Sequence, residues 1–311
     1  MNFLPDSPHT HYRRGLIAAC SSFIIWGTLP LYWYFLSHVE AGEILAHRIA
    51  WSFIFMIFVL IFTSRKQLTT DLHFLAQDKK RIGFLILAAL LITANWLIYI
   101  WAVTHGHVID TSIGYYLNPL ISVLLGVVCF SEKLSMPKQI SVVLAGIGIA
   151  LMTWQSGHFP WIALLVSGTF ALYGAVKKGL HLNPVSSITL ETFIVLAPSI
   201  FYIYNLSQNG RGHFPFGDVT TALLLLGAGI VTAVPLLLFS YGANELPLNV
   251  LGFTQYISPT LAFFWGIFFF REPFSADNLM SLSLIWVSLI IFSLGERLQT
   301  QTSRYKQRTR I

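Results

Sequence analysis

The chain has 311 residues, of which 55% are hydrophobic and only 10% are charged, and its formal net charge is +6. A water-soluble domain carries about 25% charged residues, so a fold in water would leave much apolar surface exposed. These proportions exclude an ordinary soluble domain and indicate a protein that crosses the lipid bilayer several times. The two cysteines, Cys20 and Cys129, lie in apolar stretches and predict neither a disulfide framework nor a metal site.

Ten apolar segments follow one another along the chain, with brief connections between them. A membrane-spanning helix needs about 20 mostly apolar residues. We therefore predict an all-α polytopic membrane protein with ten transmembrane helices. Their expected ranges are 15–37, 42–63, 82–103, 111–130, 139–154, 160–176, 185–206, 219–242, 249–270 and 279–295. The fifth, sixth and tenth segments are short, which leaves the count open by one.

The basic residues are distributed unevenly between the two ends of these helices. If the N-terminus faces the cytoplasm, sixteen of the nineteen lysines and arginines lie on the inner side. Only Arg211 and Arg271 then lie outside, and Arg48 lies within a helix. An excess of positive charge marks the cytoplasmic side of membrane proteins. We therefore predict that both termini are cytoplasmic, and we attribute the net charge to topology and to anionic lipid rather than to nucleic-acid binding.

The second half of the chain repeats features of the first half. A shift of 140 positions places Tyr116 on Tyr256 and Pro119 on Pro259. Four further pairs match in the same register: Gly126 with Gly266, Phe130 with Phe270, Glu132 with Glu272, and Ser135 with Ser275. With a different offset, SFIIWG (22–27) resembles TFALYG (169–174).

Five helices followed by five related helices run in opposite directions through the membrane. We therefore predict two inverted five-helix repeats, at residues 13–154 and 160–295, an architecture common among secondary transporters. The cytoplasmic tails would comprise residues 1–12 and the basic residues 296–311.

Prolines interrupt the predicted helices at Pro119, Pro235 and Pro259. A proline removes a helical hydrogen bond, and in lipid the freed carbonyl needs a partner or a wet cavity. We predict kinked helices that meet near the middle of the membrane and enclose an aromatic, weakly polar substrate pocket. Its expected lining residues are Trp26, Asn95, Tyr99, Tyr115, Asn118, Tyr173, Gln255 and Tyr256. The alternative for each of them is ordinary helix packing.

Four ionisable residues lie within the predicted helices: Glu43, His47, Arg48 and Glu191. A charge at a helix centre costs about 2.5–3.5 kcal/mol on insertion scales, so each needs a partner or a function. We predict that these residues couple transport to protons. The alternatives are a first-turn position favourable to the helix dipole, which is favoured for Glu43, and snorkelling for Arg48. The repeats align Arg48 with Glu191, but a separation of about 12 Å along the membrane normal argues against a direct ion pair.

Motifs for catalysis or metal binding are absent from the sequence. His105 and His107 lack a third ligand at a suitable spacing, so we predict no metal and no cofactor. The chain has neither H-E-x-x-H nor G-x-S-x-G, and it has no P-loop that would bind ATP. We therefore predict a carrier of small molecules and not an enzyme. The alternatives are an intramembrane enzyme and a channel, which would show a continuous polar ring.

Several motifs together resemble one known family. They are WGTLPLYW (26–33), EILAHRIAWS (43–52), NWLIYIWAVTHGHVIDTSIGYYLNPLISVLLG (95–126), TWQSGHFPWIAL (153–164), TLETF (189–193), VTAVPLLLFS (231–240) and QYISPTLAFFWGIFFFREPF (255–274). With these motifs the chain is similar to the RarD branch of the EamA family, in the drug/metabolite transporter superfamily. The resemblance extends over nearly all of residues 13–295. It implies two inverted five-helix repeats in the bacterial cytoplasmic membrane and carrier-type transport. We expect a drug or metabolite as the substrate, with proton-coupled efflux as one mode.

Overall fold

The computed structural model describes residues 8–104, 108–156, 159, 161–214, 218–269, 279–281, 283–292 and 294–295. Within these residues the secondary structure consists of helices and turns, without a strand. Predictions for residues 1–7 and 296–311 of the two tails, for His105 and His107, and for the repeat partners Phe270, Glu272 and Ser275 fall outside the described residues. Residues 8–12, predicted as part of the N-terminal tail, instead lie in the first helix, α1 (Pro8–Tyr34).

Seven helices coincide with predicted segments, and their ends differ from the predicted ends by two helical turns at most. They are α1 (Pro8–Tyr34), α2 (Ala41–Thr63), α4 (Lys79–Thr104), α5 (Val108–Phe130), α6 (Met136–Ser156), α7 (Trp161–Leu180) and α10 (Val219–Glu245). Pro119 lies inside α5 and Pro235 inside α10, as the sequence predicts.

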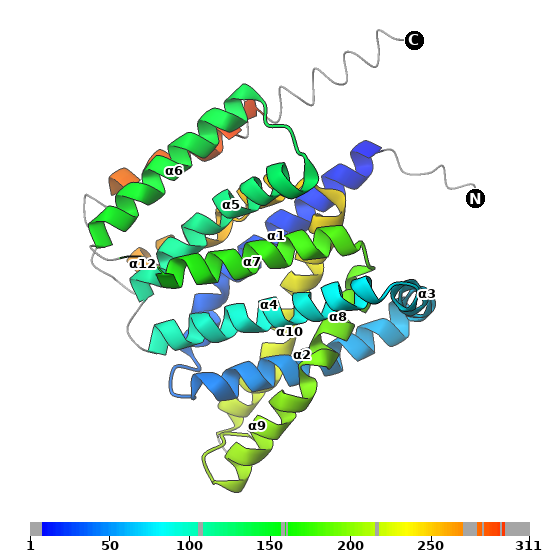
Figure 1. Ribbon diagram of the computed structural model, residues 1–311. Helices are drawn as coiled ribbons and strands as arrows, with labels where there is room; N and C mark the ends of the chain where they lie inside the picture. The colour runs from blue at the N-terminus through cyan, green and yellow to red at the C-terminus, as the bar shows by residue number, and fades with distance from the viewer. Residues whose placement is uncertain are drawn as a thin grey trace.

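An additional helix, α3 (Arg65–Ala76), occupies what the sequence analysis reads as a connection. Its sequence RKQLTTDLHFLA is too short and too polar to span a membrane. One side of α3 is nevertheless buried, because Leu75 packs against Leu85, Leu180 and Leu182. The helix therefore lies against one end of the bundle, where Figure 1 shows it beside the start of α4.

The predicted segment at residues 185–206 is divided into two helices, α8 (Pro184–Ile194) and α9 (Leu196–Gln208), which differ in direction by 49°. Asn183 caps the start of α8 by accepting hydrogen bonds from the amides of Val185 and Ser186. Pro198 explains the break, because it has no N–H to donate to the carbonyl of Ile194.

The predicted segment at residues 249–270 also contains two helices, α11 (Leu248–Thr254) and α12 (Ile257–Phe268). The interruption at Gln255 and Tyr256 precedes Pro259, which therefore lies in the first turn of α12 and not in the middle of a kinked helix. There the missing N–H costs little, because the Gln255 carbonyl accepts a hydrogen bond from the Ser258 amide instead. The predicted irregular backbone near Pro259 is therefore confirmed, whereas the predicted kink at Pro259 within one continuous helix is wrong.

The helices from the two halves of the chain are intermixed. Figure 1 shows α7 between α4 and α5, and α7 contacts both of them. Helix α10 packs against α1 and α2, and α11 packs against α5. An aromatic cluster lies at the centre: the rings of Trp26 and Phe170 are 5.5 Å apart, and those of Phe170 and Phe239 are 5.3 Å apart. The hydrophobic core is therefore shared by both halves.

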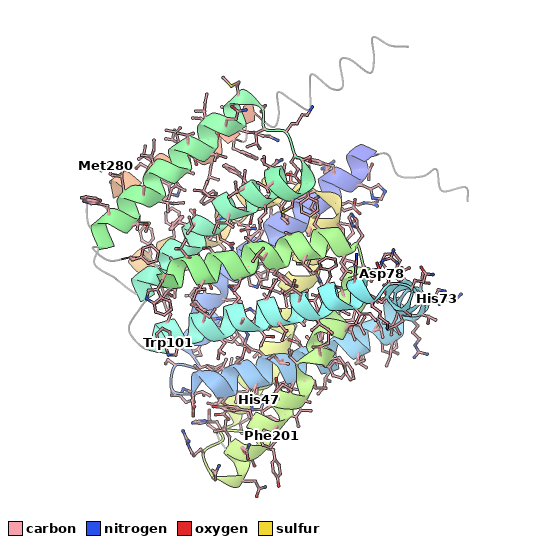
Figure 2. All side chains as sticks on the ribbon, viewed as in Figure 1. His47, His73, Asp78, Trp101, Phe201 and Met280 are labelled. Atoms are coloured by element: carbon pink, nitrogen blue, oxygen red, sulfur yellow. The ribbon has the colours of Figure 1, made fainter. Side chains whose placement is uncertain are left out.

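The outside of the bundle is largely apolar. Trp101 on α4, Phe201 on α9 and Met280 point away from the bundle (Figure 2), and their side chains are 39%, 66% and 52% exposed. Among the described residues, five helices are long and apolar enough to cross a membrane, or six if the bent pair α8 and α9 forms one span. Large apolar side chains on the outer surface of such helices are expected where lipid is the solvent.

Candidate functional site

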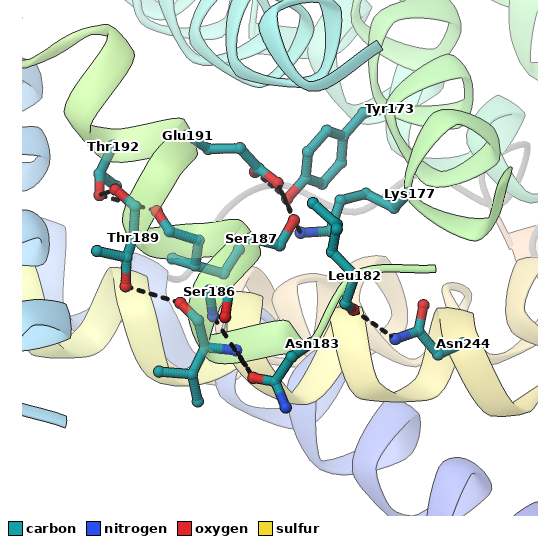
Figure 3. A network of polar contacts seen from close by, with 12 residues as sticks. Tyr173, Lys177, Leu182, Asn183, Ser186, Ser187, Thr189, Glu191, Thr192 and Asn244 are labelled. Carbon is teal, nitrogen blue, oxygen red and sulfur yellow. Dashed lines mark hydrogen bonds and ion pairs between the residues drawn. The ribbon is translucent and has the colours of Figure 1, made fainter. Parts of the chain in front are cut away.

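The most connected group of buried polar side chains centres on Glu191 in α8. Lys177 Nζ lies 2.7 Å from Glu191 Oε1, which also accepts a 2.7 Å hydrogen bond from Ser187 Oγ. Tyr173 donates its hydroxyl to Glu191 Oε2 at 3.0 Å (Figure 3). Both charged side chains are almost completely buried, at 3% and 4% exposed. We call Tyr173, Lys177, Ser187 and Glu191 the Glu191 cluster.

The fold brings the Glu191 cluster together by turning the chain sharply between α7 and α8. Tyr173 and Lys177 are four residues apart and share a face of α7, as Ser187 and Glu191 share a face of α8. Sequence reasoning assigned Tyr173 to the substrate pocket and counted Lys177 only as a topology signal. A carboxylate within an apolar helix implies a buried cation nearby, and Lys177 at the end of a predicted helix was the available signal.

A narrow cavity adjoins the Glu191 cluster between α2, α4, α8 and α10. Its lining includes Ile49, Ile92, Thr93, Trp96, Ile188, Glu191, Thr192, Val195 and Leu236. Its volume is about 10 Å³, close to the space that one water molecule needs. Helices from both halves of the chain line this cavity, which places it at their interface.

Arg48 in α2 does not reach Glu191, whose cationic partner is Lys177. Arg48 Nε instead donates a 3.0 Å hydrogen bond to Thr232 Oγ1 in α10. Its guanidinium carbon lies 4.8 Å from the ring centre of Trp33 and 4.6 Å from that of Trp96. None of these three neighbours is among the residues predicted for the substrate pocket or for proton coupling.

Glu43 and His47 form part of another polar group, at the start of α2. Both carboxylate oxygens of Glu43 are held by His213, one by its backbone N–H at 2.6 Å and one by its ring Nδ1 at 2.8 Å. His47 Nε2 lies 3.9 Å from Glu43 Oε1, and Trp51 donates to His47 Nδ1 at 3.1 Å. Sequence reasoning missed His213, which lies in a connection with no motif around it.

The predicted pocket residues are divided between several groups. Trp26 and Tyr173 belong to the central aromatic cluster. Asn95 donates to the Val166 carbonyl at 2.7 Å and to Thr169 at 3.1 Å, so it joins α4 to α7. Tyr99 and Tyr115 pack against each other with ring centres 5.6 Å apart.

The remaining predicted pocket residues lie where α5 meets α11 and α12. Gln255 Nε2 donates to Ser122 Oγ at 3.1 Å, and the rings of Tyr116 and Tyr256 are 6.4 Å apart. Asn118 is 5% exposed, and its Oδ1 has no hydrogen-bond partner among the described residues. The two halves of the chain therefore meet at positions that the sequence pairs, and a buried amide oxygen remains available there.

Glu132, just after α5, caps another helix. It accepts hydrogen bonds from the backbone amides of Leu248 and Asn249, the latter at 2.8 Å. These amides begin α11, so a residue that follows α5 caps a helix of the other half. Lys178 Nζ lies 4.0 Å from Glu132 Oε1 and adds a positive charge to the same end of the bundle.

The apolar outer surface, the membrane-length helices and the buried charges at helix interfaces together define a multi-pass helical membrane protein. No group of histidine, cysteine, aspartate and glutamate side chains within the described part of the chain is arranged to hold a metal ion. Comparison with known proteins identifies the family. Residues 13–154 match the model of the EamA-like transporter family.

Curated relatives extend the match to almost the whole chain. "Uncharacterized transporter YojE" of Bacillus subtilis is 42% identical over 93% of this chain and 96% of its own length. "Protein RarD" of Escherichia coli K12 is 38% identical over 90% of this chain and 94% of its own. The chain therefore belongs to the EamA-like transporter family and is a RarD-type member of it.

More distant proteins share the same fold. A solved crystal structure superposes with a TM-score of 0.68 over 91% of this chain and 98% of its own, at 14% sequence identity. "Chloramphenicol-sensitive protein RarD" of Pseudomonas aeruginosa is 25% identical over 89% of this chain and 93% of its own length. The family and its transporter relatives, together with the apolar helices, make this chain a multi-pass transporter of the inner membrane.

Proposed function

We propose that this protein is a secondary transporter of a small organic drug or metabolite and that it works by alternating access between two inverted five-helix repeats. The observation that carries the proposal is the contact between equivalent positions of the two halves. Tyr116 and Tyr256 coincide in the sequence repeat, and their rings lie 6.4 Å apart. A residue lies close to its own symmetry equivalent only near the axis that relates the two halves.

A second set of equivalent residues supports the same axis. The match of SFIIWG with TFALYG pairs Phe23 with Phe170 and Trp26 with Tyr173. Trp26 contacts Phe170 with ring centres 5.5 Å apart, and both lie in the central aromatic cluster. Inverted-repeat transporters place their substrate site at such an interface, near the middle of the bilayer.

The size of the interior cavity favours a carrier over a channel. The space beside Glu191 is about 10 Å³, so a metabolite enters only if the surrounding helices move apart. A carrier makes this movement in each transport cycle, whereas an open channel keeps a continuous wet path. An intramembrane enzyme is the other alternative, and it would convert its substrate rather than release it unchanged.

We extend the proposal to proton coupling at Glu43, with efflux as the direction of net transport. Glu43 accepts from the ring of His213 and lies 3.9 Å from His47, and histidine changes its charge near physiological pH. A proton taken up by this group would change the contact between α2 and the segment after α9. Glu191 is a less suitable carrier of the proton, because Lys177 already neutralises it.

The experiment is flux into proteoliposomes that contain the purified protein, with chloramphenicol and a panel of radiolabelled metabolites as probes. A carrier gives saturable uptake and counterflow against preloaded substrate. Uptake without saturation or counterflow would instead show a channel, and chemical conversion of the probe would show an enzyme. Failure of every probe to move would contradict the proposal for this substrate class.

An imposed pH gradient then tests the coupling. We expect Glu43→Gln to remove the response to the gradient and to leave counterflow intact, while Glu245→Gln at the end of α10 behaves like the wild type. Loss of the response in Glu191→Gln alone would transfer the coupling to Glu191. A response that survives in both variants would refute coupling through either carboxylate.

A further inference from the structure

Arg48 is a buried cation that has no acidic side chain beside it among the described residues. Its side chain is 7% exposed. No carboxylate among the described residues lies within ion-pair distance of its guanidinium, whose only hydrogen bond there is to Thr232. Lys177 is buried to a similar degree but is neutralised by Glu191 at 2.7 Å. Among the described residues, the positive charge of Arg48 is therefore not balanced by an acidic side chain.

An uncompensated charge in the membrane interior is costly, and residues of this kind commonly contact a substrate or an ion. The two tryptophans that flank the guanidinium reduce this cost through cation–π interactions. Their ring centres lie 4.8 and 4.6 Å from the guanidinium carbon, and such contacts do not use the guanidinium N–H groups as hydrogen bonds do. Arg48 uses Nε for Thr232, which leaves the four N–H groups of the two terminal nitrogens.

The surroundings of these four N–H groups suit a small organic anion. Tyr99 and Tyr115 lie close enough to interact electrostatically with Arg48, and their rings pack together at 5.6 Å. Neither phenol has a hydrogen-bond partner among the described residues, so each can donate to a ligand. Trp96 also lines the cavity beside Glu191, which connects the surroundings of Arg48 to the interface between the repeats.

We propose that Arg48 binds the carboxylate of an anionic substrate, with the hydroxyls of Tyr99 and Tyr115 as further donors and with Trp33 and Trp96 beside its apolar body. This assignment rests on the proposed transport function and narrows its substrate class to monocarboxylates. One arginine balances one negative charge, and its fork of donors matches the two oxygens of a carboxylate. Arg48 is then a substrate-binding residue rather than a coupling residue.

Equilibrium binding to the purified protein in lipid nanodiscs tests the site. The probes are benzoate, phenylacetate and indole-3-acetate, each compared by calorimetry with its uncharged amide. We expect at least one acid to bind, and we expect its amide to bind at least ~10-fold more weakly because it lacks the charge-assisted hydrogen bonds. Absence of binding by all three acids, or equal binding of the amides, would overturn the proposal.

Substitutions at Arg48 and Tyr99, with Arg65→Gln as the control, locate the binding. Arg48→Gln should weaken acid binding at least ~10-fold, and Arg48→Lys should weaken it less while it still prefers the acid to the amide. Arg65→Gln removes an exposed arginine at the start of α3 and should bind like the wild type. Should Arg48→Gln fail to fold, Arg48→Lys and Tyr99→Phe provide the test. Wild-type affinity in both of these variants would contradict the site.

The outcome also separates this proposal from the proposed function. Acids that bind through Arg48 but show no counterflow in proteoliposomes would contradict the transport function and leave the site standing. The converse result is that uncharged probes show counterflow that the acids do not inhibit, while the acids themselves do not bind. That result would contradict the site and leave the transport function standing.

Discussion

Individual residues show two ways of holding a charge inside this protein. Lys177 and Glu191 form a buried pair that Tyr173 and Ser187 complete with hydrogen bonds. Within the described part of the chain, Arg48 has aromatic and hydroxyl neighbours but no acidic one. A charge in a complete pair needs no further partner, whereas a charge without an acidic partner leaves capacity for a ligand. The two arrangements therefore predict different results when a charge is removed.

For the Glu191 cluster we predict strongly non-additive effects on stability. Lys177→Met leaves the Glu191 carboxylate buried without a cation, and such a loss costs about 3–5 kcal/mol. Glu191→Gln likewise leaves Lys177 unbalanced. The double variant carries neither charge, so we expect it to be less destabilised than the sum of the single variants. Denaturant unfolding in detergent measures all three, and additive losses would show that the two residues do not act as a pair.

Asn118 provides a second prediction at the same scale. Its Oδ1 is buried without a partner among the described residues, and an unpaired buried acceptor costs about 1–3 kcal/mol. We therefore expect Asn118→Leu to unfold at an equal or higher temperature than the wild type. If the amide contacts substrate, the same variant should bind substrate more weakly. Gln255→Leu is the comparison, because it removes a donor to Ser122 and should lower stability. A clear loss of stability in Asn118→Leu would refute this account.

Among the helices, α2 and α10 approach each other most closely at Gly229. Ser52 Oγ in α2 donates to the Gly229 carbonyl at 3.0 Å. A methyl group at Gly229 would lie 2.6 Å from the Ser52 amide nitrogen and would also meet the backbone of Trp51. Small residues permit such close contact between membrane helices. Arg48 and Thr232 lie on the same two helices as Ser52 and Gly229. The position of Arg48 opposite Thr232 therefore depends on the close contact at Gly229.

We predict that Gly229→Ala destabilises the protein by about 1–3 kcal/mol, because backbone atoms cannot move aside as a flexible side chain can. Gly168→Ala is a matched control, since a methyl group there meets nothing within 4 Å. Alanine favours a helix by up to ~1 kcal/mol over glycine, so the control should be as stable as the wild type or more so. Thermal unfolding of both variants decides the matter, and equal stabilities would contradict a tight α2–α10 contact.

Across the whole molecule, the contacts between the first and second halves of the chain lie at several depths. Glu132, after α5, caps α11 at one end of the bundle. Ser122 and Gln255 join the same helices further inside. At the other end His213 holds Glu43, so the halves are joined at both ends as well as near the centre. Rocking of the repeats would require at least one of these end contacts to open in each state.

The orientation of the whole chain remains a prediction from the distribution of basic residues. In a background without Cys20 and Cys129, we expect Gln208→Cys at the end of α9 to react with an impermeant thiol reagent in intact cells. Gln77→Cys after α3 should react only after the membrane is permeabilised. Both positions are exposed in the structure. Labelling of Gln77→Cys alone in intact cells would reverse the predicted topology.

The sequence by itself determined the class of the protein and most of its helices, because an apolar composition and the length needed to span a bilayer are properties of short stretches of chain. It also determined the family, and it identified Arg48, Glu43 and Glu191 as charges that need an explanation. It did not predict α3, whose polar sequence lacks the length of a span. It predicted one helix at residues 185–206 and one at residues 249–270. In the structure Pro198 divides the first segment into two helices, and a break before Pro259 divides the second.

Only the tertiary structure decided which partner each buried charge has. Lys177 lies at the end of its helix, where sequence reasoning assigns positive charge to topology, and the turn into α8 brings it to Glu191. His213 lies 170 residues from Glu43, in a segment whose sequence carries no periodicity. The partner of a charge depends on how helices distant in sequence pack together, and hydrophobic periodicity within one helix contains no information about that packing.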